Sequence, residues 1–478
     1  MRVEELTKLI KNRKVSGISS NSKTIRKNFI FVAVKGSQID GSKFIGEALA
    51  KGAKFIVCDS NVKIKYSGPV KFIRVKDTRF ALARLAACFY NDPSEKIKVI
   101  GITGTNGKTT ISYLLEAILK ESEAYPGVIG TVNYRYKNKV IPAKNTTPGP
   151  VEIQSLLADM AKGGIDYAAM EVSSHALDQD RVEGVNFHSA IFTNLTQDHL
   201  DYHKTIKDYF NAKAKLFKQI SPQSFVVINN DDKYSLRLKK ITPAKIITYG
   251  IKNRADLRAQ DIKFDINYTE FNLFLRARRI KFRIKLIGRH NIYNMLAACA
   301  WGIKEGIALK IIKRALEKFS SVPGRLERIN SKKGFCVFID YAHTDDALKN
   351  CLKALRQFSP KRIITLFGCG GERDKLKRPK MGKVVTSLSD LAVITSDNPR
   401  SEDPGDIIKD IEKGIKRSNY RVILERGKAI QKTLLLARAG DIVLLAGKGH
   451  EHYQVLKDKT IHFDDKEEAR LCLQSLNY

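Results

Sequence analysis

The fold of this chain is decided by one stretch, Val99-Ile100-Gly101-Ile102-Thr103-Gly104-Thr105-Asn106-Gly107-Lys108-Thr109-Thr110. Its apolar start is typical of a buried strand, its glycines of a turn, and residues 111–120 of an amphipathic helix. Such a turn directs backbone N–H groups at an anion, and the positive end of the helix dipole adds to the attraction. We predict a loop that binds a nucleoside triphosphate, in which Lys108 neutralises the outer phosphates and Thr109 binds Mg²⁺.

The spacing of this loop departs from the strict G-x-x-x-x-G-K-[ST] pattern, because Ile102 stands at the position of the first glycine. A glycine-rich turn that binds nothing is the alternative. A lysine followed by two threonines at a helix start has little structural purpose, so we favour the binding loop. The residues expected to bind ATP here are Gly104, Thr105, Asn106, Gly107, Lys108, Thr109 and Thr110.

Composition narrows the class of protein. A chain of 478 residues is too long for one core, and two or three domains of about 150 residues are expected. Its 43% hydrophobic and 28% charged residues are those of a soluble globular protein. No apolar run reaches the length of about 18 residues that a membrane span needs. Seven cysteines without a C-x-x-C pair fit the reducing cytoplasm, where we expect this protein.

The net charge of +35 allows two interpretations. One is a basic ATPase that binds nucleic acid, because a basic surface neutralises phosphates. The other is a lysine-rich composition spread along the whole chain, which also favours acidic substrates. The basic clusters at 276–285 and 375–383 are interrupted by apolar residues, and no nucleic-acid-binding motif accompanies them. We favour the second interpretation and expect a monomer that acts on small molecules, with no specific nucleic-acid or membrane partner.

The order of strands and helices predicts an α/β protein of three domains. Residues 1–95 form a small N-terminal α/β domain, residues 96–325 a central domain with a doubly wound, mostly parallel sheet, and residues 326–478 a C-terminal Rossmann-like α/β domain. Functional groups gather at the carboxyl ends of the strands in such sheets. Glu171 and Thr193-Asn194 follow predicted strands of the central sheet in this way.

Two groups of residues in the central domain have the chemistry of metal ligands. Glu171 ends a buried strand, and a carboxylate opposite a phosphate-binding loop suits Mg²⁺, although it could be a capping or ion-paired acid instead. The segment Asp198-His199-Leu200-Asp201-Tyr202-His203 brings together two histidines and two aspartates. This concentration favours a second metal site over a structural histidine.

Further motifs follow the quoted stretch along the chain. They are Asn145-Thr146-Thr147-Pro148, Glu171-Val172-Ser173-Ser174-His175, Thr193-Asn194-Leu195, residues 198–203, Gly288-Arg289-His290-Asn291-Ile292-Tyr293-Asn294, Pro323-Gly324-Arg325 and Asp340-Tyr341-Ala342-His343-Thr344. Together with the quoted stretch they resemble the Mur ligase family, whose members make peptidoglycan precursors by ATP-driven amide formation. The match runs from about residue 17 to about residue 467, with every motif in order.

The resemblance implies roles for single residues. An acyl phosphate forms from the substrate carboxylate and ATP, and an amine then attacks it. Asn294, Arg325 and Asp340 resemble the residues that hold adenine, phosphate and ribose, and His199 resembles a second-metal ligand. Lys213, in Tyr209-Phe210-Asn211-Ala212-Lys213, resembles a lysine that is carbamylated and bridges to Mg²⁺; without the motif, a solvated helix lysine would be the better interpretation. The catalytic set implied is Lys108, Glu171, His199 and Lys213, and the metal ligands are Thr109, Glu171, His199 and carbamylated Lys213.

The resemblance also implies the two other substrates. The first domain resembles that of members whose nucleotide substrate is UDP-N-acetylmuramoyl-L-alanyl-D-glutamate, with Asn21-Ser22-Lys23 where Asp-Ser-Arg is usual. The contacts implied for this substrate are Ser22, Thr146, Thr147, Ser173, Gln179 and Arg181. Asp397-Asn398-Pro399-Arg400 matches the motif of members that add meso-diaminopimelate. The contacts implied for this amino acid are Arg373, Asp397, Asn398, Arg400, Gly447 and Glu451.

The chemistry of the motif agrees with diaminopimelate, whose distal end carries both a carboxylate and an ammonium group. Arg400 can pair with that carboxylate, while Asp397 and Asn398 can accept hydrogen bonds from the ammonium. L-Lysine lacks the distal carboxylate and would leave Arg400 unpaired, which is costly. A ligase that adds L-lysine or another diamino acid remains an alternative, as does an Asn-Pro turn with a solvated arginine. Asp345 replaces a usual proline, and we expect little effect. A folylpolyglutamate-type ligase is disfavoured by the first domain and by residues 397–400.

Overall fold

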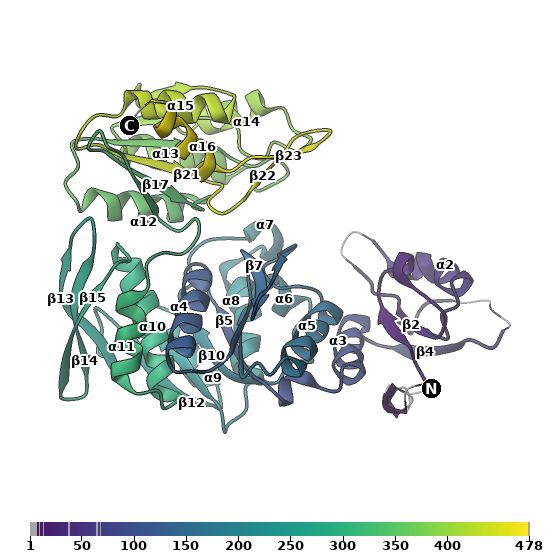
Figure 1. Ribbon diagram of the computed structural model, residues 1–478. Coiled ribbons are helices and arrows are strands. Elements are labelled where there is room, and N and C mark those ends of the chain that lie inside the picture. Colours follow the sequence, from purple (N-terminus) through teal and green to yellow (C-terminus); the bar gives the residue numbers. More distant parts are fainter. Residues whose placement is uncertain are drawn as a thin grey trace.

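The computed structural model describes residues 7–8, 10–12, 14–36, 39–63, 66 and 68–476. These residues form three successive α/β units, each built on its own main sheet (Figure 1). The predicted fold class, α/β with a mostly parallel central sheet, is confirmed. Among the described residues, no helix is both long and apolar enough to cross a lipid bilayer. All seven cysteines are free thiols.

The first unit is a four-stranded parallel sheet in the order β1-β2-β3-β4. Helix α3 covers one face of this sheet and packs with its far side against α5 of the central unit (Figure 1). The elements are β1 (Gly17–Ser19), β2 (Phe29–Val32), β3 (Phe55–Asp59), β4 (Lys71–Val75), α2 (Ile45–Ala50), α3 (Thr78–Phe89), and the 3-10 turns η1 (Ser22–Thr24), η2 (Gly41–Phe44) and η3 (Pro93–Glu95).

The central unit is an eleven-stranded sheet in the order β15-β14-β13-β12-β11-β10-β5-β9-β6-β7-β8. The strands from β13 to β6 in this order are parallel, and both ends of the sheet are antiparallel extensions. Its strands are β5 (Lys98–Thr103), β6 (Pro126–Ile129), β7 (Asn133–Tyr136), β8 (Lys139–Pro142), β9 (Tyr167–Glu171), β10 (Phe187–Phe192), β11 (Phe225–Asn229), β12 (Lys245–Gly250), β13 (Leu257–Phe264), β14 (Thr269–Leu275) and β15 (Arg278–Ile284).

Helices cover both faces of this sheet, because its buried strands place apolar side chains alternately on either side. One face packs against α4, α10 and α11, and the other against α5 and α8. Within β5, Val99 faces the second core, while Ile100 and Ile102 belong to the first. The helices are α4 (Lys108–Glu121), α5 (Pro150–Lys162), α6 (Ser174–Asp178), α7 (Leu200–His203), α8 (Ile206–Gln219), α9 (Ser235–Ile241), α10 (Arg289–Lys304) and α11 (Leu309–Lys318).

The third unit is a six-stranded sheet in the order β16-β17-β21-β18-β19-β20, parallel except for the edge strand β16. It lies above the central unit in Figure 1, with α12 between the two sheets. The elements are β16 (Glu327–Asn330), β17 (Cys336–Asp340), β18 (Ile363–Phe367), β19 (Leu391–Ile394), β20 (Tyr420–Val422), β21 (Ile442–Ala446), the hairpin β22 (Tyr453–Val455) and β23 (Thr460–His462), α12 (Asp345–Arg356), α13 (Lys377–Leu388), α14 (Pro404–Glu412), α15 (Arg426–Leu436) and α16 (Asp465–Ser475).

Polar and apolar residues alternate over 255–287, which predicts an antiparallel ribbon. The structure has this ribbon as β13, β14 and β15, and it continues the central sheet beyond β12. Its tip reaches the third unit, where the guanidinium of Arg328 donates to the carbonyl of Ile266 at 3.0 Å and to the Asn267 side chain at 2.8 Å. This contact is one of several that connect the two units besides the chain itself.

Candidate functional site

A cleft of about 1380 Å³ lies between the central and third units. Residues that follow the carboxyl ends of strands in both sheets line it. Of the residues predicted from the sequence, it is lined by Thr105, Asn106, Gly107, Lys108, Thr109, Thr110, Thr146, Thr147, Glu171, Ser173, Arg181, His199, Asn294, Arg325, Asp340, Arg373, Asp397, Asn398, Arg400, Gly447 and Glu451. Ser22, Gly104, Gln179 and Lys213 lie outside this lining.

The glycine-rich loop joins β5 to α4 in a conformation that requires glycine. Gly104 and Gly107 have φ angles of 149° and 92°, and a Cβ at Gly104 would lie 1.8 Å from the Thr193 hydroxyl. At Gly107 a Cβ would lie 2.4 Å from the side-chain oxygen of Asn294. Helix α4 begins at Lys108 without a side-chain cap, so its first N–H groups are available to an anion in the cleft.

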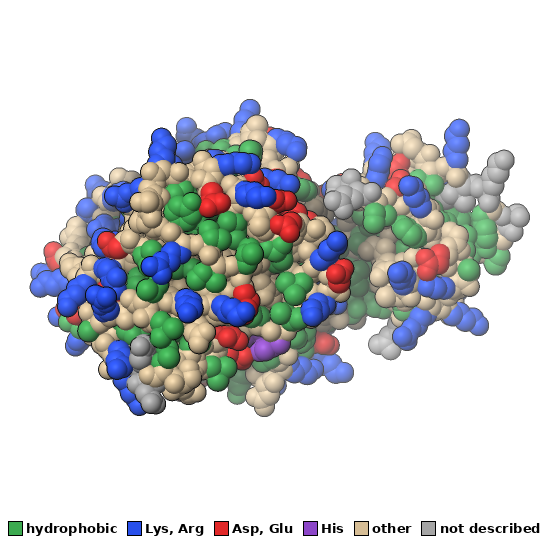
Figure 2. Space-filling model, turned by 90° about the horizontal axis from the view of Figure 1, so that it is seen from above, with side chains coloured by type: hydrophobic (Ala, Val, Ile, Leu, Met, Phe, Trp, Pro, Cys, Tyr) green, Lys and Arg blue, Asp and Glu red, His purple; other side chains and the backbone are tan. Residues whose placement is uncertain are grey.

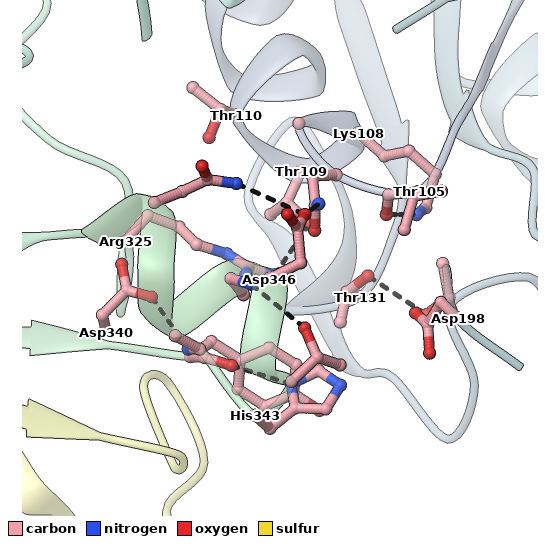
Figure 3. Close-up of a pocket in the computed structure, with 18 of the residues that line it drawn as sticks. Thr105, Lys108, Thr109, Thr110, Thr131, Asp198, Arg325, Asp340, His343 and Asp346 are labelled. Atoms are coloured by element: carbon pink, nitrogen blue, oxygen red, sulfur yellow. Dashed lines mark hydrogen bonds between the residues drawn. The ribbon is translucent and has the colours of Figure 1, made fainter. Parts of the chain in front are cut away.

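Lys108 bends back over the loop. Its Nζ donates to the carbonyl oxygens of Gly104 and Thr105, at 3.0 and 2.9 Å (Figure 3). Burial lowers the pKa of this amine. An anion in the loop would favour the protonated amine and stabilise its charge, as the phosphates of a nucleotide do.

Glu171 and Thr109 meet in the floor of the cleft. The Thr109 hydroxyl donates to one carboxylate oxygen of Glu171 at 3.0 Å, and the Thr131 hydroxyl donates to the same oxygen at 2.8 Å. The other oxygen accepts from the backbone N–H of Thr131 at 2.9 Å. A buried carboxylate and two hydroxyls beside the glycine-rich loop form a donor set that fits Mg²⁺. Thr131 was not predicted from the sequence; only its position after the short strand β6 pointed to it.

Lys213 lies on α8, directly beneath the loop. Its side chain is buried, and its Nζ donates to the carbonyl of Gly104 at 3.0 Å and lies 4.5 Å from the ring centre of Tyr209. Burial and the charge of Lys108 hold the pKa of Lys213 well below that of an ordinary lysine. A neutral amine is the form that reacts with CO₂, so the site favours carbamylation, which stays a prediction.

The segment 198–203 supplies one histidine to the cleft, not two. His199 lies 3.4 Å from the Asp198 carboxylate, and burial lowers its pKa to about 4, which leaves a neutral imidazole able to bind a metal. The ring of His203 instead hydrogen-bonds to the Ser174 hydroxyl at 2.9 Å, in the protein interior. His175 joins the lining and packs edge-on against His199. Within the described ranges, no three His, Cys, Asp or Glu side chains form a metal-binding group.

Two side chains reach the glycine-rich loop from the far side of the cleft (Figure 3): Arg325, at the boundary between the central and third units, and Asp346, in the third unit. The Arg325 guanidinium donates to the Thr109 hydroxyl at 3.3 Å and lies 4.8 Å from the ring centre of Tyr341. Asp346, in the first turn of α12, accepts from Asn106 at 3.3 Å and from Thr196 at 3.1 Å. Sequence reasoning missed Asp346, although it lies only two residues beyond the motif Asp340-Tyr341-Ala342-His343-Thr344.

Asp340 and Asn294 have partners within the protein. The carboxylate of Asp340 accepts from the backbone N–H groups of Leu326 and Ala342, at 2.7 and 2.8 Å, and so fixes the chain around Arg325. The Asn294 amide donates to the Asn291 side chain at 3.0 Å, while its oxygen packs on Gly107. Both residues line the cleft.

A third group of predicted residues surrounds Arg181 and Thr147. Arg181 donates to the Gln179 side chain at 2.9 and 2.6 Å and to the carbonyl of Thr147 at 3.1 Å. Gln179 thus orients Arg181 from outside the cleft. The Thr147 hydroxyl lies 3.2 Å from that of Ser173, and the Thr146 hydroxyl lies 3.1 Å from that of Thr131. Ser22 is in the first unit, where its hydroxyl donates to Glu47 at 2.6 Å.

The residues of 397–400 face the loop across the cleft, with Glu451 beside them. Burial raises the pKa of Asp397, but Lys448 and Arg426 outweigh it, and the pKa is lowered overall. Burial and the charge of Asp397 raise the pKa of Glu451. Gly447 has a φ of 112°, and a Cβ there would lie 2.7 Å from the Asp397 carboxylate.

The Asn398 side chain has protein partners on both its oxygen and its amide group. Its oxygen accepts from Lys448 at 3.1 Å and from the backbone of Val455 at 2.9 Å, and its amide donates to Glu451 at 2.9 Å. We predicted that this oxygen accepts from a ligand ammonium; the structure instead uses it to hold the loop. Asp397 and Glu451 are therefore the two acidic groups that this region offers to a cation in the cleft.

Three family models match this chain. They are the Mur ligase family catalytic domain over residues 14–90, the Mur ligase middle domain over 102–302, and the Mur ligase glutamate ligase domain over 324–449. The cleft is lined by residues that two of these models cover. The middle-domain model includes the glycine-rich loop, and the glutamate ligase domain model includes Asp397 and Arg400.

Relatives are similar over nearly the whole chain. A protein of Clostridium acetobutylicum named UDP-N-acetylmuramoyl-L-alanyl-D-glutamate–2,6-diaminopimelate ligase 1 is 48% identical over 95% of this chain and 94% of its own length. A ligase of Clostridium tetani, named for the same substrates, is 45% identical over 97% and 95%. A solved structure, also of a 2,6-diaminopimelate ligase, is 32% identical, with a TM-score of 0.69 over 97% and 96% of the two chains.

The fold extends to more distant enzymes. Folylpolyglutamate synthase of Mycobacterium tuberculosis superposes with a TM-score of 0.64 over 78% of this chain and 92% of its own, at 17% identity, which supports a common fold alone. Membership of a family, which is a stronger statement than a common fold, rests on the family models and on the relatives of 45–48% identity. On this evidence, the chain belongs to the Mur ligase family.

Proposed function

We propose that this chain is an ATP-dependent ligase that joins meso-diaminopimelate to the D-glutamate of UDP-N-acetylmuramoyl-L-alanyl-D-glutamate, releasing ADP and phosphate. The observation that carries the proposal is that the phosphate-binding loop and the Asp397–Arg400 motif line one continuous cleft. The names of the relatives agree with this substrate pair. The product would be a precursor of peptidoglycan.

The proposed reaction has two steps. A glutamate carboxylate oxygen attacks the γ-phosphorus of ATP, and the bond to the β-phosphate oxygen breaks, giving an acyl phosphate and ADP. The neutral amine of diaminopimelate then attacks the acyl carbon, loses a proton, and phosphate leaves. Lys108 and the N-terminus of α4 stabilise the charge on the transferring phosphoryl group. Because water would hydrolyse the acyl phosphate, closure of the third unit over the loop protects it.

Magnesium ions would supply further charge stabilisation at the phosphoryl group. We propose that Thr109 and Glu171 hold one ion, and that His199 and carbamylated Lys213 hold a second. The Thr109–Glu171 distance of 3.0 Å and the neutral state favoured for His199 support this assignment. Carbamylation would turn Lys213 from a cation into an anion, which a metal ion can bind.

We assign the remaining side chains by substrate. Arg325 binds the phosphates of ATP, and Asn294 and Asp340 border the nucleoside. Arg181, oriented by Gln179, binds an anionic group of the nucleotide-sugar dipeptide, and Thr146, Thr147 and Ser173 bind its polar groups; Ser22, in the first unit, would contact its uridine end. Arg400 and Arg373 bind the distal carboxylate of diaminopimelate. Asp397 and Glu451 accept from its ammonium, with Asn398 and Gly447 shaping the site.

We further propose that residues 1–95, 96–325 and 326–478 are the domains for the nucleotide sugar, ATP and the amino acid, and that the enzyme is a cytoplasmic monomer. Seven free thiols fit a reducing compartment. On the face shown in Figure 2, Lys and Arg side chains are dispersed among other types. This dispersal favours small anionic substrates over a nucleic acid, which a continuous basic patch would bind.

The test is phosphate release from ATP in the presence of the nucleotide-sugar dipeptide and either meso-diaminopimelate or L-lysine. Turnover with diaminopimelate and little with L-lysine would support the proposal. A preference for L-lysine would keep the ligase and overturn the role of Arg400. ATP hydrolysis stimulated by polynucleotide, without any amino acid, would instead favour a nucleic-acid-dependent ATPase.

A further inference from the structure

Arg378 is a buried cation that the proposed mechanism does not use. It lies in the first turn of α13, outside the lining of the cleft, and its side chain is 1% exposed. Its two terminal nitrogens each donate to a different oxygen of Glu402, at 3.0 Å, and one also donates to Asp410 at 3.1 Å. A guanidinium taken out of water is tolerated only with such partners, so this arrangement is tightly specified.

The two loops next to Arg378 carry residues that face the cleft. The loop after β18 contains Gly371, Glu372 and Arg373, and the loop after β19 contains Arg400. Glu372 and Arg400 both have a φ of 54°, a left-handed conformation that side chains disfavour. Such residues persist only where the surrounding contacts hold them.

Direct contacts join the two loops at their backbone. The N–H of Gly371 donates to the carbonyl of Asn398 at 2.9 Å, and the Arg400 guanidinium donates to the carbonyl of Gly371 at 2.6 Å. A Cβ at Gly371 would lie 1.9 Å from the carbonyl oxygen of Pro399, so only glycine permits this approach. A displacement of either loop therefore moves Arg400.

Glu402 connects Arg378 to both loops. Its carboxylate accepts from the backbone N–H of Glu372, and its own N–H donates to the carbonyl of Pro399 at 3.1 Å. Arg378 adds a bond to the carbonyl of Gly370 at 3.3 Å. The hydrogen bonds from Arg378 lower the pKa of Glu402 to about 2, so the carboxylate stays ionised at neutral pH.

We propose that Arg378 and Glu402 are positioning residues that fix the two loops and thereby determine the selectivity for an amino acid with a distal carboxylate. The inference rests on the proposed function, in which Arg373 and Arg400 bind that carboxylate. A carboxylate is held by two arginines only if both keep their place, and a shift of about 1 Å is enough to lose such contacts. L-Lysine, without the carboxylate, does not depend on this placement.

The experiment compares Glu402→Gln with Asp410→Asn. Each substitution replaces one of the two carboxylates that accept hydrogen bonds from Arg378 by an amide of nearly equal shape. Only Glu402 also contacts the loops. Steady-state kinetics with meso-diaminopimelate, L-lysine and ATP, and the melting temperature, are measured for both. For Glu402→Gln we expect the KM for diaminopimelate to rise about tenfold or more, as loss of a charged hydrogen bond predicts, with the KM for ATP changed less than about twofold. Asp410→Asn should lower the melting temperature and leave the KM values unchanged.

Three results would overturn the inference: equal KM values for diaminopimelate in Glu402→Gln and wild type, an equal rise in both variants, or a parallel loss with diaminopimelate and L-lysine. If neither variant folds, the same kinetics and melting temperatures are measured for Arg378→Lys. Lysine keeps the positive charge but cannot donate two parallel hydrogen bonds to the Glu402 carboxylate. Failure of the proposed function is a separate outcome, since wild-type enzyme would then show no turnover with diaminopimelate. A second measurement does not depend on turnover. Diaminopimelate should raise the melting temperature of the wild-type enzyme, and this rise should be lost in Glu402→Gln.

Discussion

Arg400→Ala is the substitution that tests the proposed amino-acid site most directly. One nitrogen of Arg400 holds the carbonyls of Gly371 and Asn398, at 2.6 and 3.3 Å. In the described part of the chain, its Nε and second terminal nitrogen make no protein hydrogen bond, so both are available to a ligand in the cleft. Alanine introduces no new backbone strain at the φ of 54°, because arginine already carries a Cβ there.

The magnitude follows from the carboxylate that would lose its partner. Truncating one side of a buried, hydrogen-bonded charge pair costs about 2–5 kcal/mol. The cleft is open, so we expect the lower end, about 2–3 kcal/mol, or roughly a 30- to 150-fold loss in kcat/KM for diaminopimelate. L-Lysine has no distal carboxylate, and its kcat/KM should change less than about threefold.

The assay is phosphate release at a fixed, saturating concentration of ATP and nucleotide-sugar dipeptide, with each amino acid varied. Lys375→Ala is the matched control, because it removes a nearby positive charge that is 66% exposed and pairs with Glu402 at 3.4 Å. An exposed pair contributes about 0–1 kcal/mol, so the control should stay near wild type. Equal losses with diaminopimelate and L-lysine in Arg400→Ala would refute the assignment of Arg400 to the distal carboxylate.

Three further predictions follow from other parts of the structure. Gly104→Ala places a Cβ 1.8 Å from the Thr193 hydroxyl, so ATP affinity by calorimetry should fall at least about tenfold; unchanged affinity would contradict the phosphate-binding loop. Lys213→Arg keeps a cation but cannot be carbamylated, so this variant should be inactive. Wild-type enzyme depleted of CO₂ should lose activity and regain it when bicarbonate is added. Activity that does not depend on bicarbonate would exclude carbamylation. The pKa of Glu305 is lowered to about 2, since hydrogen bonds from His188 and Lys98 outweigh burial. Its contribution, up to about 3 kcal/mol, is present above the unfolded pKa of about 4.3 and lost as pH falls toward 2. The melting temperatures of wild type and Glu305→Gln should therefore differ at pH 7 and converge only near pH 2.

Local sequence signals predicted the central domain well, because the same residues set both the structure and the chemistry there. The strand, glycine turn and helix start of 99–110 follow from propensity and periodicity, and the structure has them as β5 and α4. Glu171 was placed at the end of β9 and opposite the loop for the same reason. The ribbon at 255–287 was predicted from alternation alone, but its attachment to β12 is a long-range pairing that no local pattern encodes.

The sequence was a poorer guide to which side chains reach the cleft. His199 and His203 are four residues apart in one motif, yet one lines the cleft and the other bonds to Ser174 in the interior. Asn398 was predicted to accept from a ligand, but the tertiary structure places Lys448 and Val455 on its oxygen. Side-chain direction depends on neighbours distant in the chain, which spacing does not reveal.

By itself, the sequence determined the strand, glycine turn and helix start of 99–110, the alternation of strands and helices, and the motifs that identify the family, because each depends on residues close together in the chain. Only the tertiary structure decided that Arg325, at the boundary of the two units, meets Thr109, and that Asp346 of the third unit meets Asn106 in the loop. It alone also placed Arg378 and Glu402 behind the loop that carries Arg400. These contacts join segments that are distant along the chain, and the packing of the sheets and helices that carry them sets their geometry.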